Sequence, residues 1–362
     1  MANSGIRSVA AVLMGFFFIG PMLDILSTLP SSTEHIQRLR RFLLQVQGTE
    51  DRQPNELSVY PWARNHLRPL TAMPNPSKET VLFWHIPKSG GTTVKSIYEC
   101  LGQTLANRAG ADPRYRHQNR KKVIAFQPWP GFSRASYVNV DTTNKPGLDR
   151  AKNMGLVQSG LVDMIITSDI TYAVENLFDE SHKGRVLGLF RHPIDRLVSK
   201  FYYLQSASWE KQYRPQWKRI TVETFAMKKN TDNNYMVKKL AGLGVNGTVT
   251  EVDLRIAMRT IRKRFIVGLM DQMEESVHRF NIVMGINESD EENQQCMNHF
   301  FHSSLGAKKH NSNSHPEVAE GSPAWNVLAK ANALDIRLYD FILGLFDEQN
   351  ETIESYTNSY AV

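Results

Sequence analysis

The chain has few cysteines. Cys100 and Cys296 are the only two among 362 residues, which is too few for a disulfide-rich scaffold. They could form one bridge in an oxidising compartment or remain two unrelated buried thiols, and the sequence leaves both alternatives open. The chain also lacks internal repeats and extended low-complexity tracts. Its contents of 41% hydrophobic and 22% charged residues are ordinary for a globular protein, so a largely disordered chain is excluded.

Acidic residues are outnumbered. The chain carries 43 lysines and arginines against 36 acidic residues, which gives a formal charge of +7 and an isoelectric point near 9.3. This balance favours an anionic partner, whether a nucleotide, a nucleic acid, an acidic glycan or a membrane surface. A generally basic surface with no dedicated ligand is the alternative.

An apolar segment opens the chain: SVAAVLMGFFFIGPML spans residues 8–23, and ILSTLP extends it to Pro30 beyond Asp24. The whole stretch is about long enough to cross a bilayer, and Arg7 ahead of it favours a lumenal remainder. We expect residues 1–29 to be a signal-anchor, or else a cleaved signal peptide of a secreted protein. Three Asn-x-Ser/Thr sites agree with the secretory pathway: Asn246, Asn287 and Asn350.

Three further regions follow this segment. Residues 30–79 are rich in proline and charge and are interpreted as a stem, residues 80–348 as the folded domain, and residues 349–362 as a C-terminal tail. Within the domain, apolar strands alternate with helical patterns, which indicates an α/β fold whose central, mainly parallel sheet is flanked by helices. The predicted strands are 81–86, 122–126, 162–167, 185–190 and 264–269, and the predicted helices are 92–102, 193–207, 252–264, 273–285 and 324–346.

The first motif is WHIPKSGGTT, in which a buried strand ends at Pro87 and a helix begins near Thr92 or Thr93. Glycines let the backbone approach a ligand, and the N–H groups of the first helical turn then face an anion. Lys88 adds a positive charge, and Ser89, Thr92 and Thr93 add hydroxyl donors beside Gly90 and Gly91. A plain strand-to-helix turn is the alternative.

This loop is not a Walker A motif. In that motif the lysine follows the glycines and a Ser or Thr holds magnesium, whereas Lys88 comes before Gly90 and Gly91. No strand ends in an aspartate placed for Mg²⁺ either. A kinase or NTPase is therefore disfavoured, and no metal site is expected.

The second motif is LFRHPIDRLVSKFYYL, residues 189–204. Arg191 lies at the tip of a predicted strand, Pro193 suits the first helical position, and Ser199 follows on the second turn. Because ligands of an open parallel sheet bind beyond the carboxyl ends of its strands, both motifs can face one ligand with two separated anionic groups. A surface salt bridge is the alternative role for Arg191.

Together, IPKSGGTT and RHPIDRLVSKFYYL resemble the two nucleotide-binding signatures of the sulfotransferases, and more narrowly those of the Golgi carbohydrate 2-O/6-O sulfotransferases. NNYMVKKLAG, FIVGLMDQMEESVHRF and NALDIRLYDFILGLF also resemble landmarks of that family, so the likeness spans residues 81–346. The resemblance implies a P-loop NTPase-like three-layer fold, the donor 3′-phosphoadenosine 5′-phosphosulfate and a carbohydrate acceptor. It also implies a Golgi membrane location, and no nucleic acid partner is expected.

The resemblance assigns roles by motif position. Lys88 to Thr93 would hold the 5′-phosphosulfate, with Lys88 stabilising charge on the leaving oxygen, and Arg191 and Ser199 would hold the 3′-phosphate. In the 2-O/6-O group a histidine after a strand acts as base, whereas here Asp169 in MIITSDITYAVENLF takes that place. An aspartate can serve if burial raises its basicity. Glu175, His117 and His182 are the alternatives.

Other basic residues leave two interpretations open. Lys308 and Lys309 could close over the nucleotide or meet an acidic glycan, or they could belong to a solvated loop, and the same holds for Lys238 and Lys239. A descendant of the family that binds nucleotide or glycan without transferring sulfate is the second functional hypothesis, and the missing histidine motivates it.

Overall fold

A computed structural model describes residues 59–112, 120–128, 134–228, 232–244, 246–303 and 315–360. They belong to one compact unit, Ser58–Val362. The predicted anchor, residues 30–58 of the stem, His117, Lys308 and Lys309 lie outside the described residues. Within the described ranges, no helix combines the length and apolar character that a membrane span requires.

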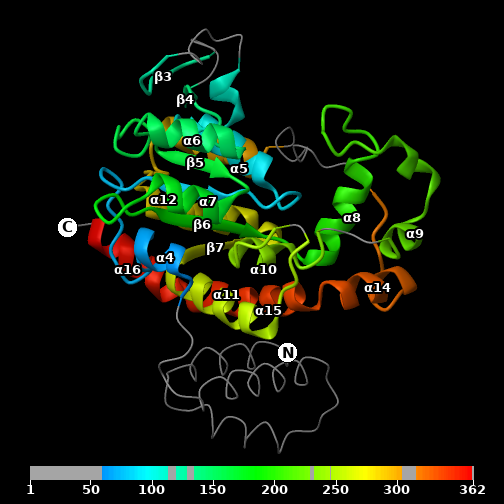
Figure 1. The fold of residues 1–362 in the computed structure, drawn as a ribbon. Helices are drawn as coiled ribbons and strands as arrows, with labels where there is room; N and C mark the ends of the chain where they lie inside the picture. Colours follow the sequence, from blue (N-terminus) through cyan, green and yellow to red (C-terminus); the bar gives the residue numbers. More distant parts are fainter. Residues whose placement is uncertain are drawn as a thin grey trace, which may run out of the picture. The chain divides into compact units, whose positions relative to one another are not determined.

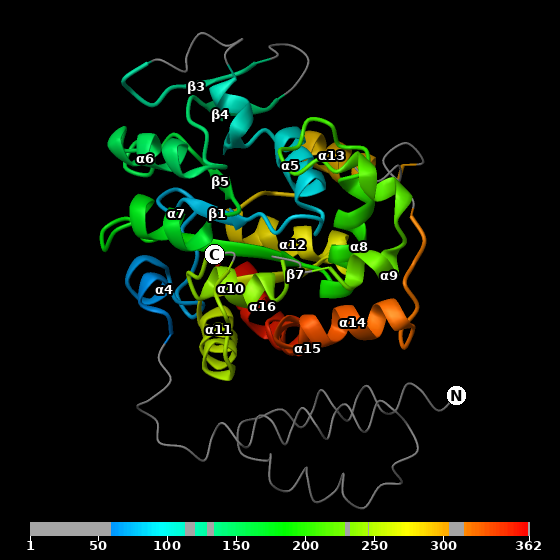
Figure 2. The same cartoon turned by 45° about the vertical axis from the view of Figure 1, so that its right-hand side comes forward.

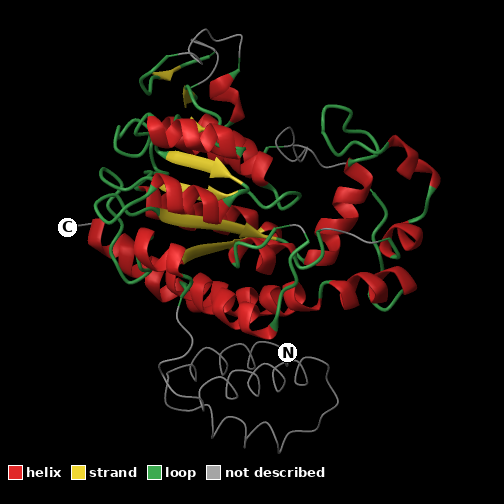
Figure 3. Cartoon of the chain, viewed as in Figure 1, coloured by secondary structure: helices red, strands yellow, loops and turns green. Residues whose placement is uncertain are grey.

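The described strands form a seven-stranded sheet in the order β3-β4-β2-β5-β1-β6-β7. Figure 3 shows the strands in yellow and the helices in red. Every neighbouring pair is parallel except β3 and β4, which are antiparallel. This confirms the predicted α/β fold with a mainly parallel sheet. The strands are β1 (Val81–Trp84), β2 (Thr104–Ala106), β3 (Ala125–Phe126), β4 (Ser136–Val138), β5 (Met164–Thr167), β6 (Arg185–Phe190) and β7 (Phe265–Leu269).

Helices account for most of the remaining described chain. Before β6 they are α4 (Pro61–His66), α5 (Gly91–Cys100), η1 (Arg108–Ala111), α6 (Lys145–Asn153) and α7 (Ile170–Leu177). Between β6 and β7 they are α8 (Pro193–Tyr203), η2 (Pro215–Arg219), α9 (Val222–Ala226), α10 (Tyr235–Leu240) and α11 (Glu251–Arg264). After β7 they are η3 (Met270–Gln272), α12 (Met273–Met284), α13 (Glu291–Phe301), α14 (Pro323–Ala331), α15 (Ala333–Glu348) and α16 (Asn350–Tyr360).

Both faces of the sheet are covered, which explains why every residue of β1, β5, β6 and β7 is buried. On one face, Phe83, Leu105 and Ile166 pack with side chains of α5, α12, α13 and α16. On the other, α6 and α7 lie over the sheet (Figures 1 and 2). Removal of these apolar side chains from water is the main stabilising term of such a layered fold.

The predicted strands at β1, β5, β6 and β7 are confirmed, because each is a short apolar run bounded by turns. The predicted helix over 324–346 is wrong as a single element. It divides at Asn332 into α14 and α15, since the buried Asn332 side chain accepts a hydrogen bond from the backbone N–H of Asn234 instead of facing solvent.

Residues on either side of the expected domain boundaries pack against the sheet layers. Trp62 is buried in α4, and Glu79 forms a buried ion pair with Arg185 at the start of β6, with 2.7 Å between Oε2 and Nε. At the other end, Ile353 and Tyr356 of α16 are buried. The compact unit therefore includes described residues on both sides of the 80–348 range that the sequence predicts for the domain.

Candidate functional site

The loop between β1 and α5 has an unusual backbone. Lys88 has a φ of 69° and Gly90 a φ of 81°, so two residues of the loop are left-handed. Such a conformation is uncommon and costly for a residue with a Cβ, and it persists only where the surroundings impose it. Among the described non-glycine residues, only Asn234 shares it. The strained residue is the lysine that the sequence assigns to the anion.

Both glycines of this loop are tightly packed. A Cβ at Gly91 would lie 2.0 Å from Cδ2 of His85, and one at Gly90 would lie 2.7 Å from Cε of Met273. The imidazole of His85 therefore lies directly beneath the start of α5. Burial lowers the pKa of His85. The negative charge of Glu210 raises this pKa in part, and the positive charge of Lys88 lowers it. His85 is accordingly a neutral packing residue, with Nδ1 3.5 Å from Oγ of Ser168.

The first turn of α5 provides the donors that the sequence predicts. Helix α5 begins at Gly91, so Thr92 and Thr93 lie in its first turn, where the backbone N–H groups of an α-helix point out of its N-terminal end. Ser89 precedes them, is only 1% exposed, and its Oγ has no hydrogen-bond partner among the described residues. A buried hydroxyl without a partner is unfavourable unless something else satisfies it. A bound anion would satisfy this one.

The second motif meets the first at the carboxyl edge of the sheet. β6 pairs directly with β1, and Arg191 follows the last residue of β6. Its Nη1 donates a hydrogen bond to the carbonyl oxygen of Lys88 at 3.2 Å. Burial lowers the pKa of Lys88, the positive Arg191 lowers it further, and Glu210 raises it. The predicted juxtaposition of Lys88 and Arg191 is thus present in the structure.

Helix α8 is fixed from its inward side. Pro193 occupies its first position and Ser199 is buried on its second turn, 8% exposed. Arg196, fully buried, donates to the carboxylate of Asp232 at 3.4 Å, and Lys200 donates to the same oxygen at 2.6 Å. This network fixes the helix that carries the second motif.

Asp169 follows β5, the other neighbour of β1, and precedes the first residue of α7. Its Oδ1 accepts a hydrogen bond from Nζ of Lys239 at 2.6 Å, in an ion pair whose side chains are each 28% exposed. Asp169 therefore lies at the same edge of the sheet as Lys88 and Arg191. The ion pair with Lys239 is a contact that the sequence does not predict.

The structure places the other base candidates differently. Glu175 is exposed on α7. His182 contacts Asp179 at 3.1 Å and precedes β6, so it lies at the amino end of a parallel strand, opposite the edge that holds Lys88. His117 lies outside the described residues. Of the residues named from the sequence, Asp169 is the one that this geometry retains.

Two of the resembling segments, about a hundred residues apart, cap each other. Asn234, left-handed ahead of α10, accepts hydrogen bonds from the backbone N–H groups of Leu334 and Asp335 at 3.1 Å. Asp335 in turn accepts from the N–H groups of Met236 and Val237 at 2.9 Å. Burial raises the pKa of Asp335 to about 6, although these two hydrogen bonds lower it in part. This double cap fixes α10 and hence Lys239 opposite Asp169.

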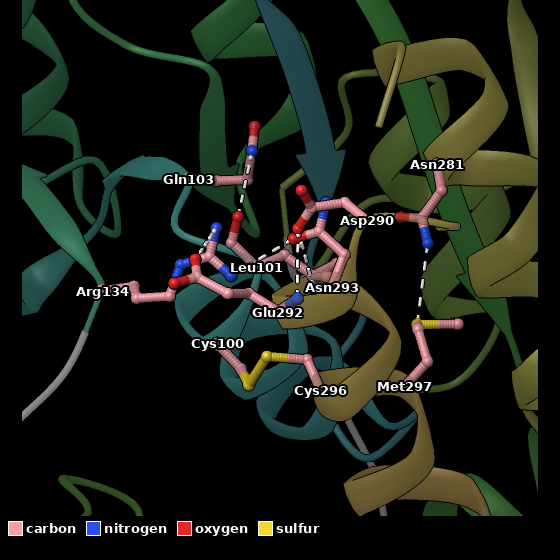
Figure 4. The surroundings of a disulfide bond; sticks show 10 residues. All are labelled: Cys100, Leu101, Gln103, Arg134, Asn281, Asp290, Glu292, Asn293, Cys296 and Met297. Carbon is pink, nitrogen blue, oxygen red and sulfur yellow. Dashed lines mark hydrogen bonds and ion pairs between the residues drawn. A yellow bond between two sulfur atoms is a disulfide. The ribbon is translucent and has the colours of Figure 1, made fainter. Parts of the chain in front are cut away.

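A disulfide fixes the far end of the loop helix. Cys100 at the end of α5 and Cys296 in α13 are bonded, which resolves the alternative that the sequence leaves open (Figure 4). Beside the bond, Arg134 pairs with Glu292 at 3.2 Å and donates to Asn293 at 3.3 Å. The helix whose N-terminus forms the loop is thus tied covalently to α13.

A cleft of about 790 Å³ is lined in part by Met273, which also packs on Gly90. Its lining carries four carboxylates, Asp271, Glu274, Glu275 and Glu288, together with His278 and His302. Carboxylates repel phosphate, so this cleft is a poor site for the anionic end of a nucleotide. Lys88 and Arg191 offer the favourable charge. The described residues contain no group of three side chains suited to a metal ion.

Comparison with protein-family models and with curated proteins finds no match. Two elements of the site were not predicted from the sequence: the ion pair of Lys239 with Asp169, and the position of the Lys88 Nζ 4.0 Å above the ring centroid of Tyr203. No sequence pattern marks either, because both join residues that are far apart in the chain.

Proposed function

We propose that this chain is a sulfotransferase that moves a sulfuryl group from 3′-phosphoadenosine 5′-phosphosulfate to a hydroxyl of a carbohydrate, and that its sheet is of the P-loop NTPase-like kind. One observation carries the proposal. The strained Lys88 of the β1 loop and Arg191 at the tip of β6 are in direct contact, 3.2 Å from carbonyl oxygen to Nη1. Two cationic residues converge there on a glycine loop that opens a helix, a typical environment for anion binding.

Each end of the donor has candidate residues. The loop from Lys88 to Thr93 would hold the 5′-phosphosulfate, with the buried hydroxyl of Ser89 and the first N–H groups of α5 as donors. Arg191 and Ser199 would hold the 3′-phosphate, since they follow β6, the strand next to the loop. The order of lysine and glycines suits one phosphosulfate better than a magnesium-bound triphosphate.

The residue types suit sulfuryl transfer. The acceptor oxygen forms a bond to sulfur while the bond from sulfur to the bridging oxygen of the donor breaks, and its electron pair remains on the 5′-phosphate. Lys88 would stabilise this developing charge as a preorganised cation. Holding both reactants in line supplies much of the remaining rate enhancement.

The acceptor hydroxyl must also lose a proton. Asp169, which replaces the histidine of the family that the chain resembles, is the base that the sequence predicts. Its place beyond β5 is compatible with the role, and its Oδ2 accepts no hydrogen bond from the described residues while Oδ1 is held by Lys239. This ion pair also favours a second candidate function, a protein that binds the nucleotide without turning it over, because it occupies part of the carboxylate.

The proposed location is the lumen of the secretory pathway, with the chain anchored in the Golgi membrane or secreted. Disulfides persist in oxidising compartments, so the Cys100–Cys296 bond supports this location. Asn246, Asn287 and Asn350 are exposed residues, as glycan attachment requires. Treatment of the secreted or Golgi-derived protein with an N-glycosidase should lower its mass, and an unchanged mass would argue against the location.

Calorimetry with the desulfated product, 3′-phosphoadenosine 5′-phosphate, tests the proposal directly. We expect binding by the wild type, strong loss of binding in Arg191→Ala, and loss of transfer by about 100-fold or more in Lys88→Ala. Lys78→Ala is the matched control, because Lys78 is exposed and precedes β1 at the opposite edge of the sheet. No binding to the wild type at millimolar product would refute the proposal. Binding without labelled sulfate on any glycan would favour the non-catalytic alternative.

A further inference from the structure

Beside Lys88 lies a cluster that the donor assignment leaves unused. The Nζ of Lys88 lies 4.0 Å above the ring centroid of Tyr203, the last residue of α8. The Tyr203 hydroxyl donates to Oε1 of Glu210 at 2.9 Å and accepts a hydrogen bond from Nε1 of Trp209 at 3.2 Å. One lysine, two aromatic rings and one carboxylate thus form a continuous chain of contacts.

The turn that carries these residues is preorganised. The N–H of Glu210 donates to the carbonyl of Ala207 at 3.0 Å, and the N–H of Arg214 closes the turn on the carbonyl of Leu204 at 2.8 Å. The rings of Tyr203 and Trp209 are 6.3 Å apart and nearly perpendicular. Backbone and side-chain contacts together hold the aromatic and acidic groups in one arrangement.

Trp209 is nevertheless 69% exposed, the second most exposed large hydrophobic side chain among the described residues. An indole held in place by its N–H but open on a face is unusual, because exposed aromatic area is unfavourable unless a partner covers it. The C–H face of a saccharide ring is such a partner. Glu210, exposed beside it, can accept hydrogen bonds from the hydroxyls of the same ring.

Glu210 also acts on the loop electrostatically. Burial lowers the pKa values of Lys88 and His85, and the charge of Glu210 raises both against that trend. The carboxylate therefore lies within electrostatic reach of the lysine assigned to the leaving oxygen. Unlike Asp169, whose carboxylate is paired with Lys239, Glu210 contacts no cationic side chain directly among its described hydrogen bonds.

From this arrangement, and resting on the proposed sulfuryl transfer, we infer that Tyr203, Trp209 and Glu210 form the acceptor subsite, with Glu210, in place of Asp169, as the base. A saccharide ring stacks on Trp209 with one hydroxyl at the Glu210 carboxylate. As its oxygen bonds to sulfur, the hydroxyl proton passes to Glu210, and the pair of electrons from the broken S–O bond remains on the donor phosphate beside Lys88. Because a carboxylate repels a uronate, the reacting sugar is neutral.

Transfer of labelled sulfate to a panel of neutral and uronate-containing oligosaccharides tests the inference. We expect Glu210→Gln to lower kcat about 100-fold or more and Asp169→Asn to have a much smaller effect. Trp209→Ala should raise the acceptor KM about tenfold. Trp209→Phe, which keeps an aromatic face, should have a KM close to that of the wild type. Glu354→Gln, an exposed glutamate on α16, is the matched control and should leave the rate unchanged.

Two further measurements separate the possible failures. Calorimetry with 3′-phosphoadenosine 5′-phosphate should give wild-type affinity for Glu210→Gln and Trp209→Ala, whereas a wild type that does not bind this product refutes the proposed function itself. Saturation-transfer NMR with the same oligosaccharides, with that product present, should show neutral sugars bound to the wild type and released in Trp209→Ala. Full turnover in Glu210→Gln, a preference for uronate acceptors, or no neutral sugar bound by a product-loaded wild type would each overturn the subsite.

Discussion

Arg191 donates a hydrogen bond to the carbonyl oxygen of Lys88, so the tip of β6 holds the loop that follows β1. The bond engages one guanidinium nitrogen and leaves the planar group able to bind a phosphate with the others. Arg191 is therefore suited to a double role, fixing the left-handed backbone of Lys88 and contacting the ligand. Its neighbour His192 is held edge-on against Tyr339 of α15.

Arg191→Lys separates these two roles. Lysine keeps the charge but lacks the planar fork that can bind a carbonyl and a phosphate together. We expect its affinity for 3′-phosphoadenosine 5′-phosphate to fall about tenfold, between the wild type and Arg191→Ala. Calorimetry measures the change. Wild-type affinity in the lysine variant would show that only the charge matters.

Gly91→Ala tests the packing of the loop. The added Cβ would lie 2.0 Å from the ring of His85, which is half-buried and contacts Ser168. We expect a loss of about 1–3 kcal/mol in the free energy of unfolding, together with weaker nucleotide binding. Denaturant titration and calorimetry report the two effects. Gly244→Ala is the control, because a Cβ there meets no atom within 4 Å.

The disulfide between Cys100 and Cys296 closes a long loop, because the two cysteines are 196 positions apart in the sequence. Constraining so long a loop in the unfolded chain is worth about 5 kcal/mol in the chain-entropy picture, and measured values are commonly about 2–4 kcal/mol. The double variant Cys100→Ser/Cys296→Ser should lose stability in this range by urea unfolding. Peptide mapping under non-reducing conditions should recover the linked pair, and two free thiols would contradict it.

Arg185 and Glu79 form an ion pair whose side chains are 2% and 5% exposed. Arg185→Met leaves Glu79 buried with Arg68 as its remaining cationic contact, so we expect a loss of about 3 kcal/mol in the free energy of unfolding. Chemical denaturation measures it. The comparison is Arg337→Ala, which breaks the solvent-exposed pair with Glu251 and should cost under about 1 kcal/mol.

His278 and Glu288 should make stability depend on pH. The hydrogen bond to Glu288 raises the pKa of His278 above its ordinary 6.5. A histidine whose pKa is higher in the folded than in the unfolded chain stabilises the fold. This contribution is complete at pH values below the pKa of the unfolded chain, and it is lost as the pH rises through the pKa of the folded chain. The contribution is modest because half of the His278 side chain is exposed. We expect His278→Gln to be less stable than the wild type in urea at about pH 5.5, and the difference to shrink near pH 8.5.

The buried strands of the sheet could be predicted because each is a continuous apolar run, and β1, β5, β6 and β7 all satisfy that pattern. β2 and β4 escaped prediction, since three residues such as Thr104–Ala106 carry no periodicity. Pairing with β5 makes that segment a strand, and pairing is a tertiary effect. The break between α14 and α15 at Asn332 is also a tertiary effect, because the Asn332 side chain accepts a hydrogen bond from the backbone N–H of Asn234.

For the site, the motifs predicted which residues meet at the sheet edge, because residues that directly follow the strands of a parallel sheet lie at its carboxyl edge. They did not predict the partners. Lys239 resembles a solvated lysine on a basic helix face, yet α15 holds α10 so that this lysine reaches Asp169. Trp209 and Glu210 lie in a turn without periodicity, and only the fold brings that turn next to Lys88.

Helix α16 bears on how the protein is made. The Tyr356 hydroxyl donates to the carbonyl of Leu70, ahead of β1, and Asn350 accepts a hydrogen bond from the buried Arg279. Both contacts join the last described helix to segments synthesised much earlier. During translation, β1 can pair with β5 and β6 as these emerge, but this face of the core stays open until α16 has been synthesised and has left the ribosome. A chaperone that shields apolar surface would therefore be needed for longest on this face of the core.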